Sequence, residues 1–249
     1  MGWFHFIFSG IFAPTYLQTH YREKCLKSFI QDVHGMVLDV GCGAQINKKR
    51  FCIHDLEYIA LDYEQILQQV DSQGRGGKPG SIKRPNINAT AIHLPCKKES
   101  IDTIICTDVL EHLSDPFIAL LEFAQALKPG GNLLISVPFL LGEHQVPYDY
   151  FRFTRFGLIS LFEKSHLMLT ELLPYQNNGV SLLLMITSFV FYDCLIPLKK
   201  IHPIIFVILY GFTIPINIMF NLLGVLCSKI PFATSNTLGF VLRARKEKK

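Results

Sequence analysis

The chain has 249 residues, of which 49% are hydrophobic and 18% charged, with a mean hydropathy of +0.29 and a net charge of +4. This length supports a buried core, and the composition excludes disordered and fibrous proteins. No basic stripe interleaved with aromatic residues is present, so we expect no nucleic-acid partner. The seven cysteines include no C-x-x-C pair. The sequence therefore predicts neither a disulfide framework nor a metal site, and favours a reducing cytosol.

The beginning of the chain, MGWFHFIFSGIF at residues 1–12, is apolar and aromatic. It is too short to span a bilayer and has no basic region before it, which makes a secretory signal a poor interpretation. Two interpretations stay open, a segment lying at a membrane interface and a cap on the fold. A helix is predicted next, over residues 19–32, where apolar residues recur at helical spacing.

Short apolar runs then alternate with helical segments. Strands are predicted at residues 36–40, 58–61, 101–106 and 132–137, and a helix at 116–127 that Lys-Pro-Gly-Gly ends. This alternation favours parallel strand–helix–strand units, and therefore an open α/β sheet. Ligands of such sheets bind beyond the carboxyl ends of the strands, so we expect the chemistry there.

The loop QGRGGKPGSIKRP at residues 73–85 is rich in glycine, proline and basic residues. A phosphate-binding loop would place Ser or Thr after the Gly-Lys pair, and Pro79 stands there instead. A mobile connection is therefore the better prediction.

The segment VLDVGCG at 37–43 indicates a cofactor site. The first predicted strand ends near Asp39, and Gly41 and Gly43 allow a tight turn and a close approach of a ligand to the backbone. Asp62 ends the next strand, near the roughly 20-residue offset at which a carboxylate binds a ribose diol. A dinucleotide site would have a third glycine near position 46, which is Ile46 here. NAD and FAD are therefore disfavoured.

Four blocks in this order and spacing resemble class I S-adenosylmethionine (SAM)-dependent methyltransferases with a type-11-like domain. They are VLDVGCG at 37–43, YIALDY at 58–63, the block from LP to DVLEHL at 94–113, and LKPGGNLLISVP at 127–138. The resemblance covers residues 33–173 and a final strand, and extends to members found in cell-surface glycan clusters. It implies a Rossmann-like α/β sheet with helices on both faces, and SAM as cofactor.

The resemblance also implies roles for particular residues. Asp39, Gly41 and Gly43 would lie against the methionine part of SAM, and Asp62 would accept hydrogen bonds from both ribose hydroxyls.

The same resemblance implies contacts to two further parts of SAM, the sulfonium and the adenine. Thr107 and Asp108 would lie near the sulfonium. The family usually reads the adenine with an acid before Leu94-Pro95, but residues 88–93 contain no carboxylate. Asn88 and Thr90 are the two alternatives for that contact.

A methyl transfer needs mainly alignment of the acceptor and exclusion of water, because the donor is already activated. A general base is required only when the acceptor carries a proton, as a hydroxyl does. Glu111 and His112 follow the third predicted strand and are candidates. The polar segment 143–155 follows the fourth, and His144 is the first candidate base.

The rest of that segment has two interpretations. A similar run occurs in methyltransferase-like proteins of cell-surface glycan clusters, and in the functional interpretation Tyr148, Asp149 and Arg152 shape the acceptor site. In the structural one, Thr154 caps a helix and Asp149 pairs locally with Arg152.

Two apolar segments, 180–198 and 201–227, each reach the about 20 residues that a bilayer span requires. Residues 237–245 resemble the last methyltransferase strand, so an apolar helical hairpin is predicted to be inserted before it. Two full spans would place Lys199 and Lys200 outside, against the positive-inside tendency. A hairpin dipping into the cytoplasmic leaflet is favoured, with two spans, packing on the sheet and a dimer interface as alternatives. The basic tail, residues 243–249, suits an anionic membrane surface or is solvated.

The sequence thus predicts an apolar segment and lead-in helix at 1–32, a SAM-binding core at 33–175, a membrane-associated hairpin at 176–230, and a last strand and tail at 231–249. The predicted function is a SAM-dependent methyltransferase on the cytoplasmic side of a membrane. Its small-molecule acceptor would be an amphipathic, lipid- or glycan-linked molecule carrying a hydroxyl or similar group. The alternative is a non-catalytic, membrane-tethered scaffold, which the missing adenine-side acid keeps open. The oligomeric state is open.

Overall fold

The computed structural model describes residues 10–53, 55–72 and 84–248. Most of the apolar beginning of the chain and of the loop predicted at 73–85 lies outside these ranges. The chain divides into two compact units. The sheet unit comprises Lys24–Leu173 and Gly239–Lys249, and the helical unit comprises the described residues up to Glu23 together with Pro174–Leu238.

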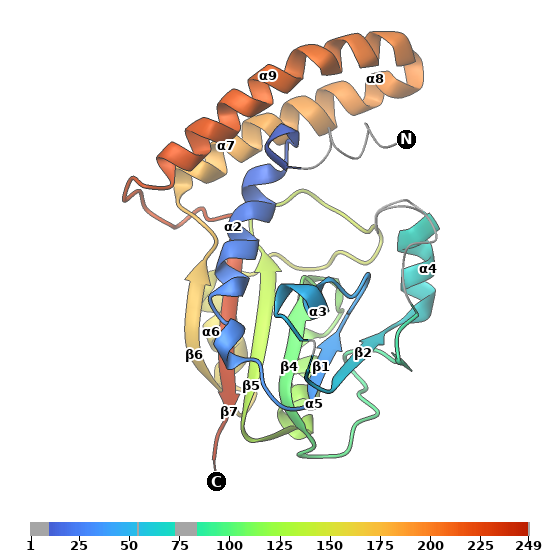
Figure 1. The fold of residues 1–249 in the computed structure, drawn as a ribbon, viewed down its shortest axis with the longest axis vertical. Helices are drawn as coiled ribbons and strands as arrows, with labels where there is room; N and C mark the ends of the chain where they lie inside the picture. The colour runs from blue at the N-terminus through green and yellow to red at the C-terminus, as the bar shows by residue number, and fades with distance from the viewer. Residues whose placement is uncertain (1–9, 54, 73–83, 249) are drawn as a thin grey trace. The chain divides into compact units, whose positions relative to one another are not determined.

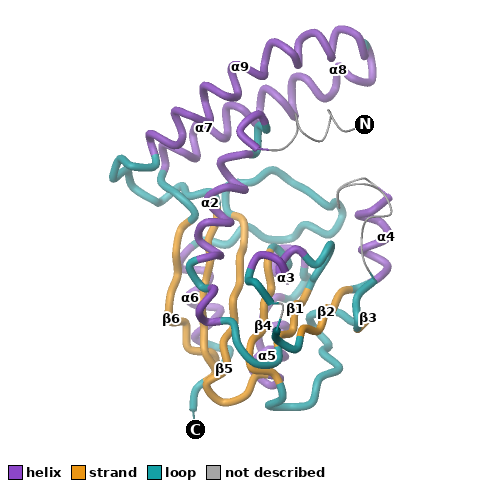
Figure 2. The backbone as a smooth tube through the Cα atoms, viewed as in Figure 1, coloured by secondary structure: helices purple, strands orange, loops and turns teal. Residues whose placement is uncertain are grey.

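A seven-stranded sheet in the order β3-β2-β1-β4-β5-β7-β6 forms the sheet unit (Figure 2). The neighbouring strands from β3 to β5 are parallel, whereas β7 runs antiparallel to β5. The strands are β1 (Val37–Val40), β2 (Tyr58–Asp62), β3 (Ile87–Asn88), β4 (Ile101–Thr107), β5 (Leu127–Pro138), β6 (Leu167–Pro174) and β7 (Gly239–Lys246). The central strands are buried on both faces, as their nearly continuous apolar sequences require.

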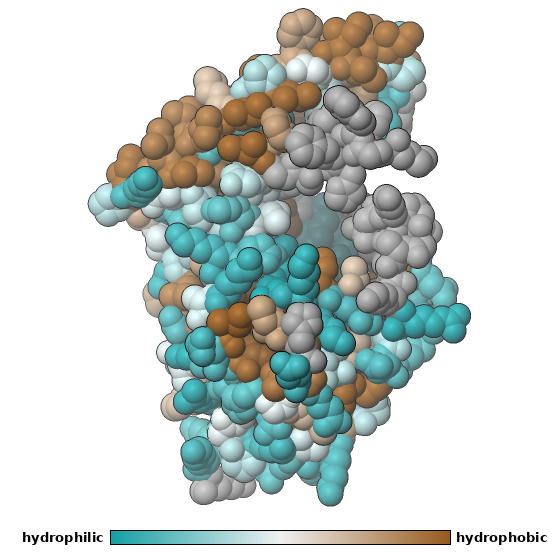
Figure 3. Space-filling view, in the orientation of Figure 1, coloured by the Kyte–Doolittle hydropathy of each residue, from teal (hydrophilic) through white to brown (hydrophobic). Residues whose placement is uncertain are grey.

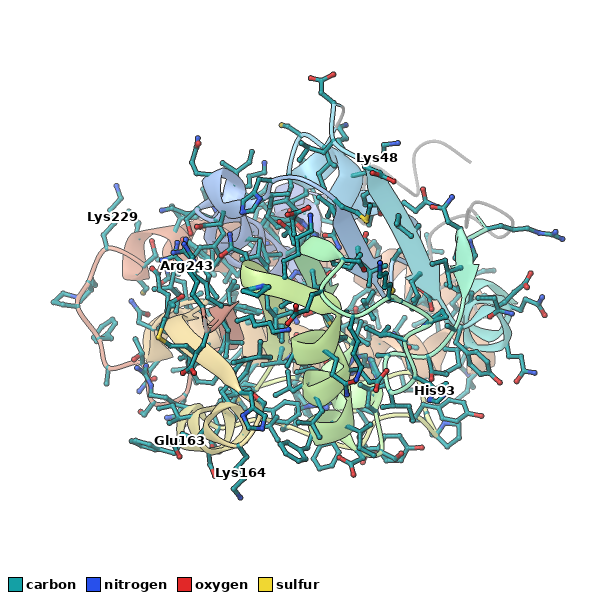
Figure 4. All side chains as sticks on the ribbon, turned by 90° about the horizontal axis from the view of Figure 1, so that it is seen from below. Lys48, His93, Glu163, Lys164, Lys229 and Arg243 are labelled. Atoms are coloured by element: carbon teal, nitrogen blue, oxygen red, sulfur yellow. The ribbon has the colours of Figure 1, made fainter. Side chains whose placement is uncertain are left out.

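Helices cover both faces of this sheet. They are α3 (Ile46–Arg50), α4 (Glu64–Ser72), α5 (Pro116–Ala126) and α6 (Arg155–Glu163), with 3-10 turns at Ile30–Asp32 and Leu110–His112. Helices α5 and α6 lie on one face and α3 on the other (Figures 1 and 4). Asp115 caps α5 by accepting hydrogen bonds from the amides of Phe117 and Ile118. The predicted Rossmann-like sheet with helices on both faces is confirmed.

Two boundaries predicted from the sequence differ from those in the structure. Helix α2 (Tyr16–Lys27) ends earlier than predicted, and a separate 3-10 turn follows it. The Lys-Pro-Gly-Gly segment lies within β5, where Ile101 pairs with Leu127 and Thr103 already pairs with Asn132. The extra residues form an irregularity in the strand, with Gly130 at a φ of 82°. The pairing of β5 with β4 therefore begins at Leu127, before the Lys-Pro-Gly-Gly segment.

The helical unit contains the predicted hairpin before the last strand. Its elements are the 3-10 turn Gly10–Phe12, the beginning of α2, α7 (Asn178–Ser188), a π-helical stretch (Phe189–Leu195), α8 (Ile196–Ile201) and α9 (Pro203–Cys227). Helices α7 and α9 lie side by side (Figure 1). Asn221 ties the beginning of the chain to α9, since its Nδ2 donates to the carbonyls of Ile11 (2.7 Å) and Ala13 (3.0 Å).

The outer surface of the hairpin is apolar. Figure 3 shows hydrophobic side chains gathered over α7–α9, and Ile204, Phe212 and Leu226 are 75%, 69% and 59% exposed. Two helical segments, Asn178–Lys199 and Pro203–Cys227, are long and apolar enough to cross a membrane, and 33% and 22% of their most apolar stretches are buried. The fold thus offers an apolar surface, which weakly suggests membrane association.

Candidate functional site

A cavity of about 180 Å³ lies in the sheet unit, at the carboxyl ends of β1, β2 and β4. The strand order reverses here, because β2 lies on one side of β1 and β4 on the other. This is the place where open α/β sheets bind their ligands. Six of the residues predicted from sequence line the cavity: Gly41, Gly43, Asp62, Thr90, Asp108 and His112.

The glycine loop after β1 forms one wall. Gly41 has a φ of 69°, and a Cβ there would come within 2.2 Å of the Cγ2 atom of Val109. Only glycine fits this position. Gly43 has a φ of 49°, and no atom of the described residues lies within 4 Å of an added Cβ. Its backbone is therefore open to a close approach by a ligand.

Asp62 is held against the same loop. Its Oδ2 accepts a hydrogen bond from the amide of Gly43 at 2.8 Å, and its Oδ1 accepts one from the amide of Tyr63 at 2.7 Å. Burial raises the pKa of Asp62, although these two amides lower it. Because two carboxylate oxygens offer about four acceptor positions, this side chain has capacity left for two hydroxyl groups.

Asp39 and Thr107 do not line the cavity. Asp39 is fully buried, and it accepts hydrogen bonds from Nδ2 of Asn47 at 2.8 Å and from the hydroxyl of Tyr58. Burial raises the pKa of Asp39 to about 6. The Asn47 amide also donates to Thr107 at 3.1 Å. These side chains therefore fasten α3 to the ends of β1 and β4, and support the glycine loop from outside the cavity.

The two adenine-side alternatives differ in position. Thr90 lines the cavity, between Ala89 and Ala91. Asn88 is exposed, and its Oδ1 accepts a hydrogen bond from the amide of Glu64 at 3.0 Å, at the beginning of α4. Its side-chain oxygen is thus engaged in capping a helix.

Sequence reasoning missed the apolar wall and one polar residue of the cavity. Tyr63, Ile66 and Leu67 line it beside Asp62. Their spacing along the beginning of α4 is helical, and this was the signal that could have identified them. Gln145 also lines the cavity, and no sequence pattern indicates it.

Asp108 joins β4 to β5 at the cavity. Its backbone has a φ of 55°, its amide donates to the carbonyl of Ser136 at 2.9 Å, and its Oδ1 accepts from the Ser136 hydroxyl at 2.8 Å. This double contact holds the beginning of the segment that contains Glu111 and His112 against the sheet.

Glu111, His112 and His144 form a cluster at the cavity. Glu111 is fully buried, and its Oε1 lies 3.7 Å from Nε2 of His112 and 4.0 Å from Nε2 of His144. The imidazole rings of the two histidines meet edge to face, with centroids 4.7 Å apart. Burial raises the pKa of Glu111 well above its usual value and lowers the pKa of His112. The predicted acceptor-side residues from two separate segments thus come together.

Arg152 and Asp149 fold the segment that carries His144. The guanidinium and the carboxylate form two hydrogen bonds of 2.7 Å, and Arg152 also donates to the carbonyls of Leu141 and Gly142, each at 2.9 Å. Asp149 in turn accepts from the amide of His144 at 2.8 Å. Burial alone would raise the pKa of Asp149. The hydrogen bonds from Arg152 outweigh that effect, and the pKa is lowered to about 2.

Both interpretations of segment 143–155 have counterparts in this arrangement. The local Asp149–Arg152 pair is present, and Thr154 caps α6 by accepting from the amide of Gly157 at 3.1 Å. The carbonyl of Tyr148 lies 2.5 Å from Nδ1 of His112. The local structure therefore places His144 beside His112.

Comparisons with known proteins place this fold and site in a family. The family model described as "Methyltransferase domain" matches residues 15–170. A ubiquinone biosynthesis O-methyltransferase from Coxiella burnetii (strain Dugway 5J108-111) is 28% identical over 129 residues, which cover 51% of this chain and 54% of that protein. The chain matches about half the length of such curated relatives.

Solved structures share the fold at low sequence identity. A SAM-dependent methyltransferase from Mesorhizobium loti has a TM-score of 0.51 at 12% identity, with 92% of this chain and 99% of that chain covered. A Haemonchus contortus phosphoethanolamine N-methyltransferase 2, solved in complex with SAM, has a TM-score of 0.50 at 13% identity, with 98% and 60% covered. The sheet order, the cavity at its reversal point and the matching family model lead to one conclusion: this chain belongs to the class I SAM-dependent methyltransferases.

Proposed function

We propose that this protein transfers a methyl group from SAM to a hydroxyl oxygen of an amphipathic, membrane-associated small molecule. The observation that carries the proposal is the mixed chemistry of one cavity. A carboxylate and an open glycine backbone, Asp62 and Gly43, line it together with His112 of the histidine cluster. We assign Asp62 and Gly43 to a cofactor end and His112 to an acceptor end.

In this proposal the cofactor end holds SAM through the residues that line it. Asp62 accepts hydrogen bonds from the ribose hydroxyls, the backbone at Gly41 and Gly43 borders the methionine part, and Thr90 lies on the adenine side. Asp39 and Thr107 act through Asn47 as positioning residues for the loop. When bound, SAM supplies a methyl group on a positively charged sulfur. Asp108 lies at the cavity, where a negative charge suits that sulfur.

At the acceptor end, the chain's own task is to remove a proton from the hydroxyl as the new C–O bond forms. Nε2 of His144 is the first candidate to accept it, with His112 as the second, and Asp149 and Arg152 hold His144 in place. Tyr148 positions His112 through its carbonyl oxygen.

Two observations support the acceptor class. The curated relatives are named ubiquinone biosynthesis O-methyltransferases, which points to oxygen as the methylated atom. The exposed apolar side chains of α7–α9 suit a protein that lies on a membrane, where amphipathic lipid- or glycan-linked acceptors are found. We place the protein on the cytoplasmic side of that membrane, because the cysteines favour a reducing compartment.

Isothermal titration with SAM tests the cofactor part. The wild type is expected to bind, and Asp62→Ala to bind about 10- to 100-fold more weakly, because it loses charge-assisted hydrogen bonds of about 1.5–3 kcal/mol. Glu163→Ala, at the exposed end of α6, is the matched control (Figure 4). Absence of wild-type binding at millimolar SAM would refute the proposal, and unchanged binding by Asp62→Ala would refute the ribose contact.

Transfer of labelled methyl from SAM onto membrane lipid extracts tests the acceptor class. Label in an extractable lipid fraction is the expected result, with His144→Ala giving at least tenfold less. SAM binding without transfer to any extract would favour the scaffold interpretation instead.

Flotation with lipid vesicles tests the membrane part. The wild type is expected to float with the vesicles, and the paired change Val207→Glu and Ile208→Glu to reduce the floated fraction. Both side chains are exposed on α9, at 59% and 54%. A wild type that stays wholly in the soluble fraction, and is released completely from cell membranes by carbonate, would contradict membrane association.

A further inference from the structure

The carboxylate of Glu111 lies fully buried without a hydrogen-bond donor. Among the residues that the structure describes, neither Oε1 nor Oε2 has a hydrogen-bond partner, and its exposed fraction is 0%. Burying a carboxylate in this way is costly unless a proton or a cation compensates its charge. The position of Glu111 therefore calls for a proton on the carboxylate or a cation beside it.

Two imidazole nitrogens face the same oxygen. Nε2 of His112 is also buried without a hydrogen-bond partner in the described part of the chain, and it lies 3.7 Å from Oε1. Nε2 of His144 lies 4.0 Å from Oε1. These separations are just under twice a metal–ligand bond of about 2.0–2.2 Å. The ligand atoms of the three side chains lie within 4.8 Å of one another, so a small adjustment of the side chains would let one ion contact all of them.

The outer nitrogens of both rings are placed as metal-binding histidines require. Nδ1 of His112 meets the carbonyl of Tyr148, and Nδ1 of His144 faces the carbonyl of Gly142 at 3.3 Å and Oδ2 of Asp149 at 3.4 Å. Arg152 Nη2 lies 3.3 Å from the same nitrogen, but it already donates to Asp149 and Gly142. With the protons on Nδ1, both Nε2 lone pairs point toward the carboxylate.

We propose that Glu111, His112 and His144 bind a divalent transition-metal ion such as Zn²⁺ or Mn²⁺. Two imidazoles and one carboxylate form a ligand set that such ions accept, and three protein ligands leave positions open for a further molecule. His112 lines the cavity, so an open position can face the acceptor. The expectation that no metal is bound rests on the cysteines alone, and this site contains histidine and glutamate ligands instead.

The cation would change the roles within the cluster. A ring nitrogen that binds a metal cannot accept a proton, so His112 and His144 would serve as ligands. The ion would lower the pKa of a hydroxyl bound to it, and the hydroxyl proton would leave to solvent before the methyl group is transferred. This second step rests on the proposed methyl transfer, whereas metal binding does not.

Metal titration of the full-length protein, after removal of metals with a chelator, tests the site. Calorimetry with Zn²⁺, and electron paramagnetic resonance with Mn²⁺, are expected to give one tight ion per chain. Glu111→Gln and His144→Ala should each weaken that affinity at least tenfold. Glu163→Gln and His93→Ala are matched controls, since both residues are exposed and lie outside the cluster (Figure 4). These controls should bind as the wild type does.

The outcomes separate this inference from the proposed function. A wild type with no tight ion, or one whose affinity neither cluster variant changes, would overturn the metal site. Circular dichroism of each variant shows whether it folds. If the buried Glu111→Gln does not fold, His144→Ala, at a side chain 27% exposed, carries the test alone. SAM titration on the same samples is a separate readout, because metal binding without SAM binding would refute only the proposed function.

Discussion

Several ion pairs lie on the surface of the sheet unit, whereas the helical unit exposes many apolar side chains. Asp102 with Lys128, and Asp32 with Arg243, are pairs on the surface of the sheet unit, with N–O distances of 2.7 Å. In the helical unit, Ile204 and Phe212 are mostly exposed. One surface suits water and the other suits an apolar medium.

The two units also differ in what their buried polar side chains contact. In the helical unit, Asn177 donates to the carbonyls of Cys227 and Ile230, and Thr187 donates to that of Pro14, so these side chains join segments of backbone. In the sheet unit, the buried carboxylate of Glu111 instead faces other side chains at a cavity. Buried polar groups thus join segments of backbone in the helical unit, whereas the sheet unit also holds one buried carboxylate, Glu111, beside two histidines at a cavity.

The largest effect is expected from Gly41→Ala in the sheet unit. The new Cβ would come within 2.2 Å of Val109, at a φ of 69°. Crowding and the left-handed backbone together should lower the free energy of unfolding by about 2–5 kcal/mol, and SAM affinity should fall as well. Urea unfolding and SAM titration measure both.

Gly142→Ala is the control for that change, since an added Cβ there has no neighbour within 4 Å in the part of the chain that the structure describes. Unchanged stability in Gly41→Ala would contradict the close packing of the loop. We expect SAM binding to depend on the sheet unit and vesicle binding on the helical unit. If folded Gly41→Ala lost vesicle binding, that separation would be refuted.

A smaller effect is expected from Gly224→Ala in the helical unit. The added Cβ would meet Cδ1 of Leu17 at 2.5 Å, and the leucine side chain can move, so the cost should be about 1–3 kcal/mol. Thermal unfolding measures it. SAM affinity at low temperature should not change, and a clear change would show that the units are coupled.

Gly211→Ala provides the contrast within the same helix. Among residues 10–53, 55–72 and 84–248, none comes within 4 Å of its added Cβ, and alanine is the better helix former by about 1 kcal/mol. This variant should be slightly more stable than the wild type, and a destabilisation would indicate a contact on that face of α9.

The smallest effect is expected from the surface pair of the sheet unit. Burial alone would raise the pKa of Asp102. The hydrogen bonds from the Lys128 ammonium and the Met36 amide outweigh that effect, so the pKa is lowered. A lowered folded-state pKa adds stability above the unfolded-state value, which is lost as pH falls through the folded-state value. Asp102→Asn should cost about 0.2–1 kcal/mol at pH 7.

Urea unfolding between pH 7 and pH 3 measures this difference. The curves of the wild type and of Asp102→Asn should converge at the acid end. A constant gap across that range would mean that the ion pair contributes nothing that titrates.

Much of the site could be predicted because it lies at strand ends. Gly41, Gly43 and Asp62 directly follow β1 or end β2, and local sequence places them at the carboxyl edge of the sheet. Asp39 is close to them in sequence, but its neighbours Asn47 and Tyr58 are set by tertiary packing. Local sequence therefore could not show that Asp39 is enclosed.

The acceptor end depends on contacts that no local pattern encodes. His112 and His144 approach because two loops fold against each other. The Tyr148 carbonyl contacts His112, and the backbone amides of Tyr150 and Phe151 donate hydrogen bonds to the Glu111 carbonyl. The beginning of β5 illustrates the same limit, since pairing with β4 overrides the turn signal of Lys-Pro-Gly-Gly.

The position of β7 sets an order of events during synthesis. This strand comes last in the chain, yet it lies between β5 and β6, and Phe240, Leu242 and Ala244 are buried in the core of the sheet. Chains leave the ribosome from the amino end, so α7–α9 are released before the strand that completes the sheet. The apolar hairpin is thus synthesised while the methyltransferase sheet is still open between β5 and β6.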